Sequence, residues 1–287
     1  MPIAATAIKR LRIAVRGPFD ADWMLGFFAK RAIPELERVH EATYSRVIEG
    51  SAAPLTVHVT DRALSVAMPA DLGNRAAQIR TQLRRVFDTD ADSAAIDAHL
   101  RADPHLRAVV QRSPGLRVPG AFDGFELAVR AILGQQVSVV RATVLAQKLV
   151  GRYGARHAAG STFPTPDCLA RQTPAEIGMP GRRGEAVRRL AEMVARGDIE
   201  LSAASHPDEL RKALTAIAGI GPWTAQYIAM RAGRDADAFP DSDWVILKQL
   251  GTTPAGALRV AEAWRPFRAY AVMYLWASAA APTAKAA

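Results

Sequence analysis

Alternating hydrophobic and polar positions in the first third of the chain predict a small antiparallel sheet. Residues 11–16 alternate apolar and basic side chains, and two further alternating runs, 54–60 and 63–68, stand on either side of Asp61-Arg62. A period of two residues is typical of half-buried strands, and the short break between the last two runs predicts a hairpin. Residues 44–49 are a further candidate strand beside that hairpin.

A helical period marks two segments in the same part of the chain. One helix is expected to begin at Asp20 or Asp22, either of which can cap it, and to run to about Ala32. The other is expected over 71–87, where apolar side chains recur on one face. The first 97 residues are therefore predicted to form a sheet with helices on one face.

Beyond this point the pattern becomes helical. Asp123 is predicted to cap a helix, and Glu126 three positions later completes a capping box. Ser138 is predicted to cap the next helix, which should end near Leu149 because Gly151 follows. Later segments are predicted as a loop over 154–173, a basic helix that ends near Arg196, and helices over 255–264 and 266–278.

The stretch from Leu214 to Lys248 combines helical periodicity with two closely spaced glycines. A helix over 207–217 is broken by Gly219 and Gly221, and a second helix is predicted to begin at Pro222 and to reach Arg231. The free amides at such a turn and at the following helix start are suited to binding a phosphate. An ordinary corner between two helices is the alternative, and the glycines alone do not decide between them.

Composition narrows the class of protein. The 287 residues carry a formal net charge of +9, which suits a polyanionic partner. Cys168 is the single cysteine, so an internal disulfide framework and a cluster that needs several thiolates are excluded. No apolar run is long enough for a membrane span, and the N-terminus lacks the apolar core of a signal peptide. We therefore expect a cytoplasmic protein with no membrane partner.

Several motifs together resemble one family. The stretch 214–231, followed by Asp241 and Asp243 in Phe-Pro-Asp-Ser-Asp, is similar to the helix–hairpin–helix DNA glycosylase superfamily, and within it to the DNA-3-methyladenine glycosylase II branch. The segments 22–27, 114–120 and 130–138 match in the same order along the chain. The resemblance implies an α+β fold: an N-terminal α+β domain, followed by a mostly α-helical region of two lobes. The boundaries are 1–97 for the domain and 98–287 for the region, with one lobe at 123–235 and the other at 98–122 plus 236–287.

The resemblance also implies an active site. Asp243 lies 22 residues after Gly221, which is the spacing of the family's catalytic aspartate, and Asp241 is the nearby alternative. Without the family, Asp243 would be interpreted as the N-cap of the following helix. The positions that match the base pocket, or lie next to the catalytic aspartate, are Phe27, Trp223, Tyr227, Trp244 and Trp276. Each of these aromatic residues could instead pack in the core.

Contacts with DNA are implied in the same way. The residues expected to touch the phosphate backbone are Gly219, Gly221, Thr224, Arg182, Arg183 and Lys248, although the charged side chains could be ordinary solvated ones. Gln136 occupies the position of the side chain that fills the space of the displaced base, and a helix-capping role is its alternative. The backbone carbonyls near Thr215, Ile217 and Ile220 are expected to hold a monovalent cation, Na⁺ or K⁺, when DNA is bound. No other cofactor, and no iron–sulfur cluster, is expected.

The function implied is a monofunctional N-glycosylase that flips alkylated bases, chiefly 3-methyladenine, out of duplex DNA and leaves an abasic site. Bifunctional relatives place a lysine where Trp223 stands, and an indole cannot form their Schiff base. Two alternatives remain: a glycosylase for another class of lesion, and a non-catalytic helix–hairpin–helix module that only binds DNA. The expected partner is double-stranded DNA that contains alkylated bases, and the expected oligomeric state is a monomer.

Overall fold

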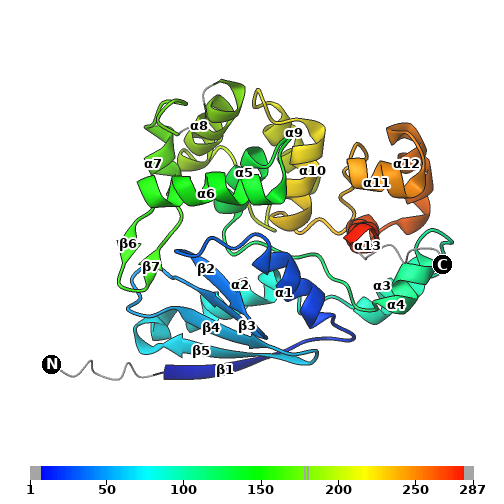
Figure 1. Ribbon diagram of the computed structural model, residues 1–287, viewed down its shortest axis with the longest axis horizontal. Helices are drawn as coiled ribbons and strands as arrows, with labels where there is room; N and C mark the ends of the chain where they lie inside the picture. Colours follow the sequence, from blue (N-terminus) through cyan, green and yellow to red (C-terminus); the bar gives the residue numbers. More distant parts are fainter. Residues whose placement is uncertain (1–7, 178, 180, 281–287) are drawn as a thin grey trace, which may run out of the picture.

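The computed structural model describes residues 8–177, 179 and 181–280, and it has the predicted α+β architecture (Figure 1). The N-terminal part contains a five-stranded antiparallel sheet in the order β1-β5-β4-β3-β2. Its strands are β1 (Ile8–Ala14), β2 (Glu37–His40), β3 (Thr43–Arg46), β4 (Leu55–Val59) and β5 (Ala63–Pro69). The predicted hairpin over 54–68 is confirmed as β4 and β5, in which Val57 pairs with Val66.

Two details of the sheet differ from the prediction. β1 begins earlier and ends at Ala14 instead of Arg16. β2 was not predicted, because its residues Glu-Arg-Val-His show little apolar alternation. Its Glu37 is nevertheless buried, and an ion-pair network described below explains why a charged residue can face the core.

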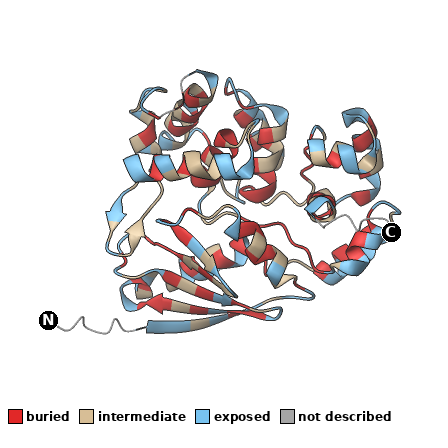
Figure 2. Ribbon diagram, viewed as in Figure 1, coloured by how far each residue is buried: buried red, intermediate tan, exposed pale blue. Residues whose placement is uncertain are grey.

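Helices cover one face of this sheet. α1 (Ala21–Ala29) begins at Asp20, whose side chain accepts a hydrogen bond from the Trp23 amide. The helix predicted over 71–87 is divided into a 3₁₀ segment, η1 (Ala70–Arg75), and α2 (Ala76–Val86). Buried and exposed positions alternate along the strands (Figure 2), so the sheet has one face in the core and one outside it.

The rest of the chain is mainly helical. Its first helices are α3 (Ser93–Leu100), α4 (Arg107–Arg112), α5 (Gly124–Leu133), α6 (Val139–Tyr153), α7 (Pro166–Ala170) and α8 (Arg182–Ala195). They are followed by α9 (Pro207–Thr215), α10 (Pro222–Arg231), α11 (Trp244–Leu250), α12 (Pro254–Ala261), η2 (Glu262–Trp264) and α13 (Arg268–Ala280). The two helices predicted around Gly219 and Gly221 are therefore confirmed as α9 and α10.

Three local predictions in this region are wrong. Asp123 caps α5, but the Glu126 carboxylate does not complete a capping box, because it is buried against Arg46 and Arg130. α6 continues through Gly151 to Tyr153, since a glycine inside a helix costs only about 1 kcal/mol relative to alanine. The segment 154–173 is also not a plain loop, because it contains the short strands β6 (Arg156–His157) and β7 (Gly160–Ser161) and the helix α7.

Buried apolar side chains form three clusters. One joins the sheet to α1 and α2, a second lies within the helices from α5 to α10, and a third joins α3, α4 and α11 to α13. The domain boundary expected after residue 97 falls inside α3, whose Ile96 and Leu100 pack in the third cluster. α3 therefore belongs by its packing to the same lobe as α13.

Candidate active site

A cavity of about 850 Å³ lies between the N-terminal domain and the helical lobes. Its walls come from α1, β2, β3, α5, α6, α10, α11 and α13. Of the residues predicted to form the site, it is lined by Phe27, Trp223, Tyr227, Asp243 and Trp276. Segments that are widely separated in the sequence thus meet at one concave site, as is usual for ligand pockets.

Asp243 lies in this cavity with its carboxylate bound by four donors. Oδ1 accepts from the amides of Val245 and Ile246 at 3.0 and 3.1 Å, which makes Asp243 the N-cap of α11. The indole Nε1 of Trp223 donates to Oδ2 at 2.9 Å, and that of Trp276 donates to Oδ1 at 3.2 Å. The N-cap interpretation and the pocket interpretation therefore hold together, because the same carboxylate caps the helix and lines the cavity.

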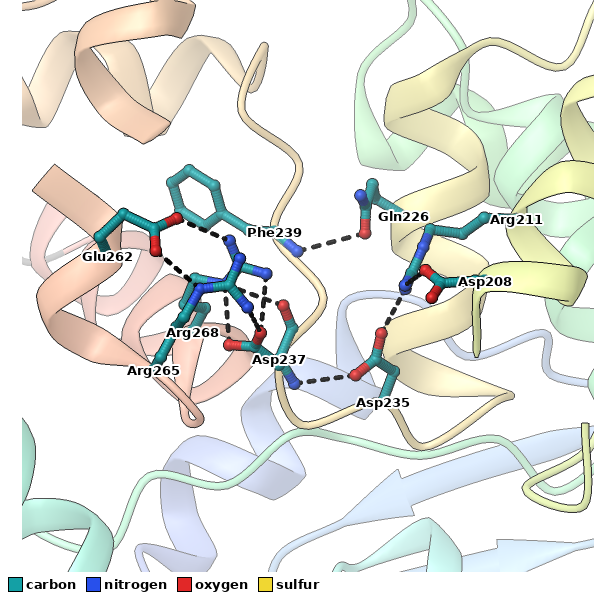
Figure 3. A network of polar contacts seen from close by, with 9 residues as sticks. All are labelled: Asp208, Arg211, Gln226, Asp235, Asp237, Phe239, Glu262, Arg265 and Arg268. Carbon is teal, nitrogen blue, oxygen red and sulfur yellow. Dashed lines mark hydrogen bonds and ion pairs between the residues drawn. The ribbon is translucent and has the colours of Figure 1, made fainter. Parts of the chain in front are cut away.

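The loop between α10 and α11, which carries Asp243, is fixed by ion pairs at its start. Asp235 pairs with Arg211 of α9, and Asp237 pairs with Arg265 and Arg268 at the beginning of α13 (Figure 3). The pair between Asp237 and Arg268 is 2.8 Å long, and the Arg268 side chain is largely buried. Both lobes thus hold this loop through guanidinium groups.

The end of the same loop is fixed by packing. Phe239 is buried with its ring 6.0 Å from that of Trp264, and its amide donates to the side-chain oxygen of Gln226 (Figure 3). The Asp243 amide then donates to the Pro240 carbonyl at 2.9 Å. Asp241, the alternative catalytic residue, does not line the cavity, whereas Asp243 does.

Aromatic rings form one side of the cavity. Trp223 and Tyr227, four residues apart on α10, stack with ring centres 5.3 Å apart and planes inclined by 11°. The ring centre of Trp276, on α13, lies 6.2 Å from that of Tyr227. Phe27 of α1 lines the cavity as well, although only 7% of it is exposed. We refer to Phe27, Trp223, Tyr227, Trp276 and Asp243 as the aromatic side of the cavity.

Two arginines beside these rings were not predicted from the sequence. Arg31 lies with its guanidinium carbon 3.7 Å from the centre of the Phe27 ring, and Arg231 donates to the Tyr227 hydroxyl at 2.5 Å. Burial acts to raise the pKa of Tyr227, but the charges of Arg231 and Arg31 outweigh it, so this pKa is lower than usual. No motif marked these arginines, because each occupies an ordinary helical or loop position.

Trp244 was expected among the residues of the base pocket, and this expectation is wrong. Its ring is 70% exposed and does not line the cavity. The Asp243 side chain turns back to cap α11, so the next residue along the helix points to solvent. There the Lys248 ammonium lies 5.0 Å from the centre of the Trp244 ring.

The hairpin between α9 and α10 depends on its first glycine. Gly219 has φ +97°, and a Cβ there would lie only 3.1 Å from Ala186 Cβ and from the Arg182 carbonyl oxygen of α8. Gly221 has open space around its Cα, so its backbone is accessible to a ligand. Thr224, in the first turn of α10, is buried as a whole residue, so a phosphate would reach it only if this turn opens.

The segment between α5 and α6 is tied to this hairpin. The Gln135 side-chain amide donates to the Gly219 carbonyl at 2.9 Å and to the Thr224 hydroxyl at 3.0 Å. The neighbouring Gln136 is exposed and has φ +56°. Sequence reasoning selected Gln136 and missed Gln135, whose partners lie 84 and 89 residues further along the chain.

The other predicted DNA contacts lie on the surface. Arg182 is exposed and Arg183 half-buried at the start of α8, next to the hairpin glycine, and Lys248 is exposed on α11. Thr215 ends α9, and the Ile217 carbonyl accepts the Ile220 amide within the hairpin at 3.0 Å. These carbonyls belong to the end of a helix, where intrahelical donors are missing.

A second side of the cavity consists of buried charges. Glu37 and Glu126 face Arg46 and Arg130, with Glu37 at 3.2 Å from Arg46 and at 2.9 Å from Arg130. The pair of Arg130 with Glu126 is 2.8 Å long. Burial acts to raise the pKa of Glu37, but the charges of Arg130 and Arg46 outweigh it and lower this pKa. We refer to Glu37, Arg46, Glu126 and Arg130 as the charged side of the cavity.

Two further properties bear on cofactors and compartment. Among the described residues, no group of three or more histidine, cysteine, aspartate or glutamate side chains is arranged to hold a metal ion. Over the same part of the chain, the helices are too short or too polar to cross a bilayer.

Comparison with known proteins places this chain in a family. Residues 10–123 match the model of the AlkA N-terminal domain. The chain is 35% identical to DNA-3-methyladenine glycosylase 2 of Escherichia coli, over 90% of this chain and 94% of that protein. It is 39% identical to a Mycobacterium tuberculosis protein named probable bifunctional transcriptional activator/DNA repair enzyme AlkA. That match covers 95% of this chain but only 58% of the relative's length. The fold resembles the 3-methyladenine DNA-glycosylase of Archaeoglobus fulgidus, with a TM-score of 0.80 at 21% identity over 93% of this chain and 97% of that one.

Proposed function

The chain belongs to the family of DNA-3-methyladenine glycosylase 2, and we propose that it removes alkylated bases from duplex DNA as a monofunctional N-glycosylase. The substrates would be 3-methyladenine and related cationic purines, and the product an abasic site in an intact strand. The observation that carries this proposal is the Asp243 carboxylate, held by two indole N–H groups beside stacked aromatic rings.

A base inside a duplex is out of reach, so the enzyme must turn it out of the stack. The cavity supplies the receiving space, and Gly134 and Val137, on either side of Gln136, line it. Because Gln136 is exposed next to the cavity, its side chain is suited to enter the space that the displaced base leaves. This role remains a proposal for a polar side chain.

The aromatic side would select substrates by charge. A base alkylated at a ring nitrogen carries a positive charge, which the face of an aromatic ring attracts by about 0.5–2 kcal/mol. Arg31 and Arg231 already occupy positions over Phe27 and near Tyr227. The faces that remain for a cationic base are therefore those of Trp223 and Trp276.

Asp243 would act on the sugar. When the bond between C1′ and the base nitrogen breaks, its electron pair leaves with the base and neutralises the positive charge there. The sugar is left as an oxocarbenium-like cation, which a nearby carboxylate stabilises. A water molecule then attacks C1′, and Asp243 can orient that water and accept its proton. No acid is required for the leaving base, because it departs uncharged.

We propose base removal without strand cleavage. A lyase reaction needs an amine that forms a Schiff base with the sugar, and at the position after the hairpin the chain carries the indole of Trp223. This indole donates its N–H to Asp243, so it serves the carboxylate and not the sugar carbon.

The hairpin would hold the DNA backbone. The amides of Gly219, Gly221 and Thr224 would meet a phosphate, assisted by Arg182, Arg183 and Lys248. The carbonyls near Thr215 and Ile217 stand at the negative end of α9, and together with that of Ile220 they would hold a monovalent cation. Such a cation would neutralise charge at that phosphate. We propose that the protein is a monomer. We also propose that it holds no iron–sulfur cluster, since Cys168 is the only cysteine.

The test is to incubate the full chain with duplexes that each contain one defined lesion and to identify the released bases by chromatography. We expect 3-methyladenine to be released, strands to stay intact until alkali is added, and borohydride to trap no covalent adduct. Release of oxidised or deaminated bases only would favour a different lesion class. If the chain binds DNA but releases no base, this outcome would favour the alternative of a non-catalytic DNA-binding module.

A further inference from the structure

The N-terminal sheet has an outer face on which residues of one chemical kind are aligned. Side chains in register form two rows across all five strands. One row is Arg12, Ser65, His58, Thr43 and His40, and the other is Arg10, Ala67, Thr56, Ser45 and Arg38. We call these ten residues the open sheet face. All ten are exposed or half-buried, whereas residues of the row between them, such as Val57 and Val66, are buried.

The open sheet face is positively charged and contains no carboxylate. It has three arginines, two histidines and four hydroxyl side chains among its ten positions. Glu37 of β2 is buried on the other face of the sheet, and the nearby Glu41 and Asp61 stand in the turns between strands, where Asp61 pairs with Arg62. The Arg80 guanidinium of α2 lies at the edge of the sheet, where it donates to the Arg12 carbonyl of β1 at 3.2 Å.

Some arginines elsewhere on the surface are paired with a carboxylate, so that their charge is partly balanced. Arg16 contacts Asp92 at 2.5 Å, Arg84 contacts Asp90 at 2.8 Å, and Arg196 contacts Asp198 at 2.8 Å. Among the described residues, Arg10, Arg12 and Arg38 have no ion-pair partner. The charge of the open sheet face is therefore available to an anionic ligand.

The chemistry of this face fits a nucleic-acid backbone. Guanidinium and hydroxyl groups are the side chains that contact phosphate oxygens in protein–DNA complexes. The open sheet face has no phenylalanine, tyrosine or tryptophan on which a base could stack, so it would bind the backbone of a duplex without reading its sequence. An acidic peptide offers carboxylates to the same donors, so competition by polyglutamate is used below to separate it from nucleic acid.

The open sheet face lies far from the hairpin. Figure 1 shows β1 and the other strands at one side of the molecule and the connection of α9 to α10 at the opposite side. The hairpin and the open sheet face would therefore contact different segments of DNA.

We propose that the open sheet face is a second binding site for duplex DNA, which holds an undamaged segment while the hairpin and the cavity engage a lesion. Binding at this face needs only phosphates, so it does not depend on base removal. Its physical consequence is that one protein molecule bridges two duplex segments.

A bridging experiment tests this inference. One short duplex that contains an abasic site is immobilised and saturated with the full chain, and a second, undamaged, fluorescent duplex is then titrated at several salt concentrations. We expect the wild type to capture the second duplex with a strong salt dependence. The variant with Arg10→Gln, Arg12→Gln and Arg38→Gln should capture it at least about tenfold more weakly. The slope of log K against log salt should fall by about 3, because each phosphate that the variant no longer neutralises accounts for about 0.9.

A matched variant separates local charge from net charge. Arg16→Gln, Arg84→Gln and Arg196→Gln remove the same total charge from paired positions, so capture should change less than about twofold. Base release from a short lesion duplex should be the same for both variants, which distinguishes this inference from the proposed catalytic function. Equal capture by the wild type and the first variant would overturn the inference. Displacement of the second duplex by polyglutamate at equal charge concentration would overturn the assignment to nucleic acid.

Discussion

The two sides of the cavity both contain buried carboxylates, but these have different partners. On the aromatic side, Asp243 accepts hydrogen bonds from two indoles and two backbone amides, all of them uncharged. On the charged side, Glu37 and Glu126 lie against two guanidinium groups. Neutral donors hold a carboxylate in place without cancelling its charge. A guanidinium group also holds the carboxylate, but its positive charge cancels the negative one.

This difference separates the carboxylate of the proposed reaction from a structural one. None of the four donors to Asp243 carries a charge, so its own charge would be available to the cation that the proposed reaction forms. The charges of Glu37 and Glu126 are balanced within the protein, and they join the N-terminal domain to α5 of the helical region. The comparison predicts that substitutions on the aromatic side reduce activity and that those on the charged side reduce stability.

The largest effect is expected for Asp243→Asn. Asparagine is as good an N-cap as aspartate, so α11 and the fold should be retained, but the charge opposite the sugar is lost. Base release should fall by about 10²–10⁴-fold, the range for a positioned acid–base group, while duplex binding persists. Single-turnover release of 3-methyladenine measures this. Asp241→Asn is the control and should keep wild-type activity, and a fully active Asp243→Asn protein would contradict the role of Asp243.

Glu126→Ala should show the opposite behaviour. It leaves Arg46 buried with one carboxylate fewer, and breaking a buried ion pair costs about 3–5 kcal/mol of the free energy of unfolding. Urea unfolding at neutral pH measures the loss, and base release per folded molecule should change little. The matched substitution Glu185→Ala removes a surface pair with Arg188 and should cost at most about 1 kcal/mol. Equal losses for the two variants would show that the buried network does not stabilise the fold.

Trp223→Phe tests the orientation of Asp243 within the aromatic side. Phenylalanine keeps a ring against Tyr227 but removes the N–H that donates to Oδ2. Loss of a hydrogen bond to a charged group costs about 1.5–3 kcal/mol, so base release should fall by about 10- to 100-fold. Trp244→Phe, on the exposed ring next to Asp243, should leave the rate unchanged. A larger loss of base release for Trp244→Phe than for Trp223→Phe would show that Trp244 contributes to the base pocket.

The smallest effect concerns the ionisation of Tyr227. The Tyr44 hydroxyl donates to Glu37, and burial together with the Glu37 carboxylate raises the pKa of Tyr44. For Tyr227, by contrast, the charge of Arg231 contributes to lowering the pKa. Below its folded pKa, Tyr227 is protonated in both states and adds no pH dependence. As the pH rises through the folded pKa towards the unfolded one, the folded state releases its proton first, so stability gains a favourable contribution. The absorbance difference between wild type and Tyr227→Phe should show a phenol that ionises below the usual range, and a higher pKa would contradict the effect of the arginines.

The aromatic side could be predicted largely from the sequence because its parts are local or follow a family motif. Trp223 and Tyr227 stand one helical turn apart, and Asp243 follows the hairpin at a fixed spacing. The exception is Trp244, because the sequence does not show which way a side chain next to a helix cap points. Local capping rules also assigned Glu126 to the capping box at the helix start, whereas in the fold its side chain is buried in the ion-pair network.

The charged side could not be predicted. The partners of its ion pairs are up to 93 residues apart, and glutamates and arginines on helices and strands are usually solvated. No local pattern distinguishes Glu37 from an exposed glutamate. The same limit applies to Gln135, whose neighbour Gln136 matched a family position and whose own partners became visible only in the fold.

The bond network of Gln135 has a mechanical consequence. One amide nitrogen donates both to the hairpin carbonyl of Gly219 and to the hydroxyl of Thr224, so two hydrogen bonds connect the turn before α6 to the turn before α10. In the proposed complex, Gln136 would enter the duplex while the hairpin holds a phosphate. An intact base pair that resisted Gln136 would then act, through the Gln135 side chain, on the turn that contacts the backbone.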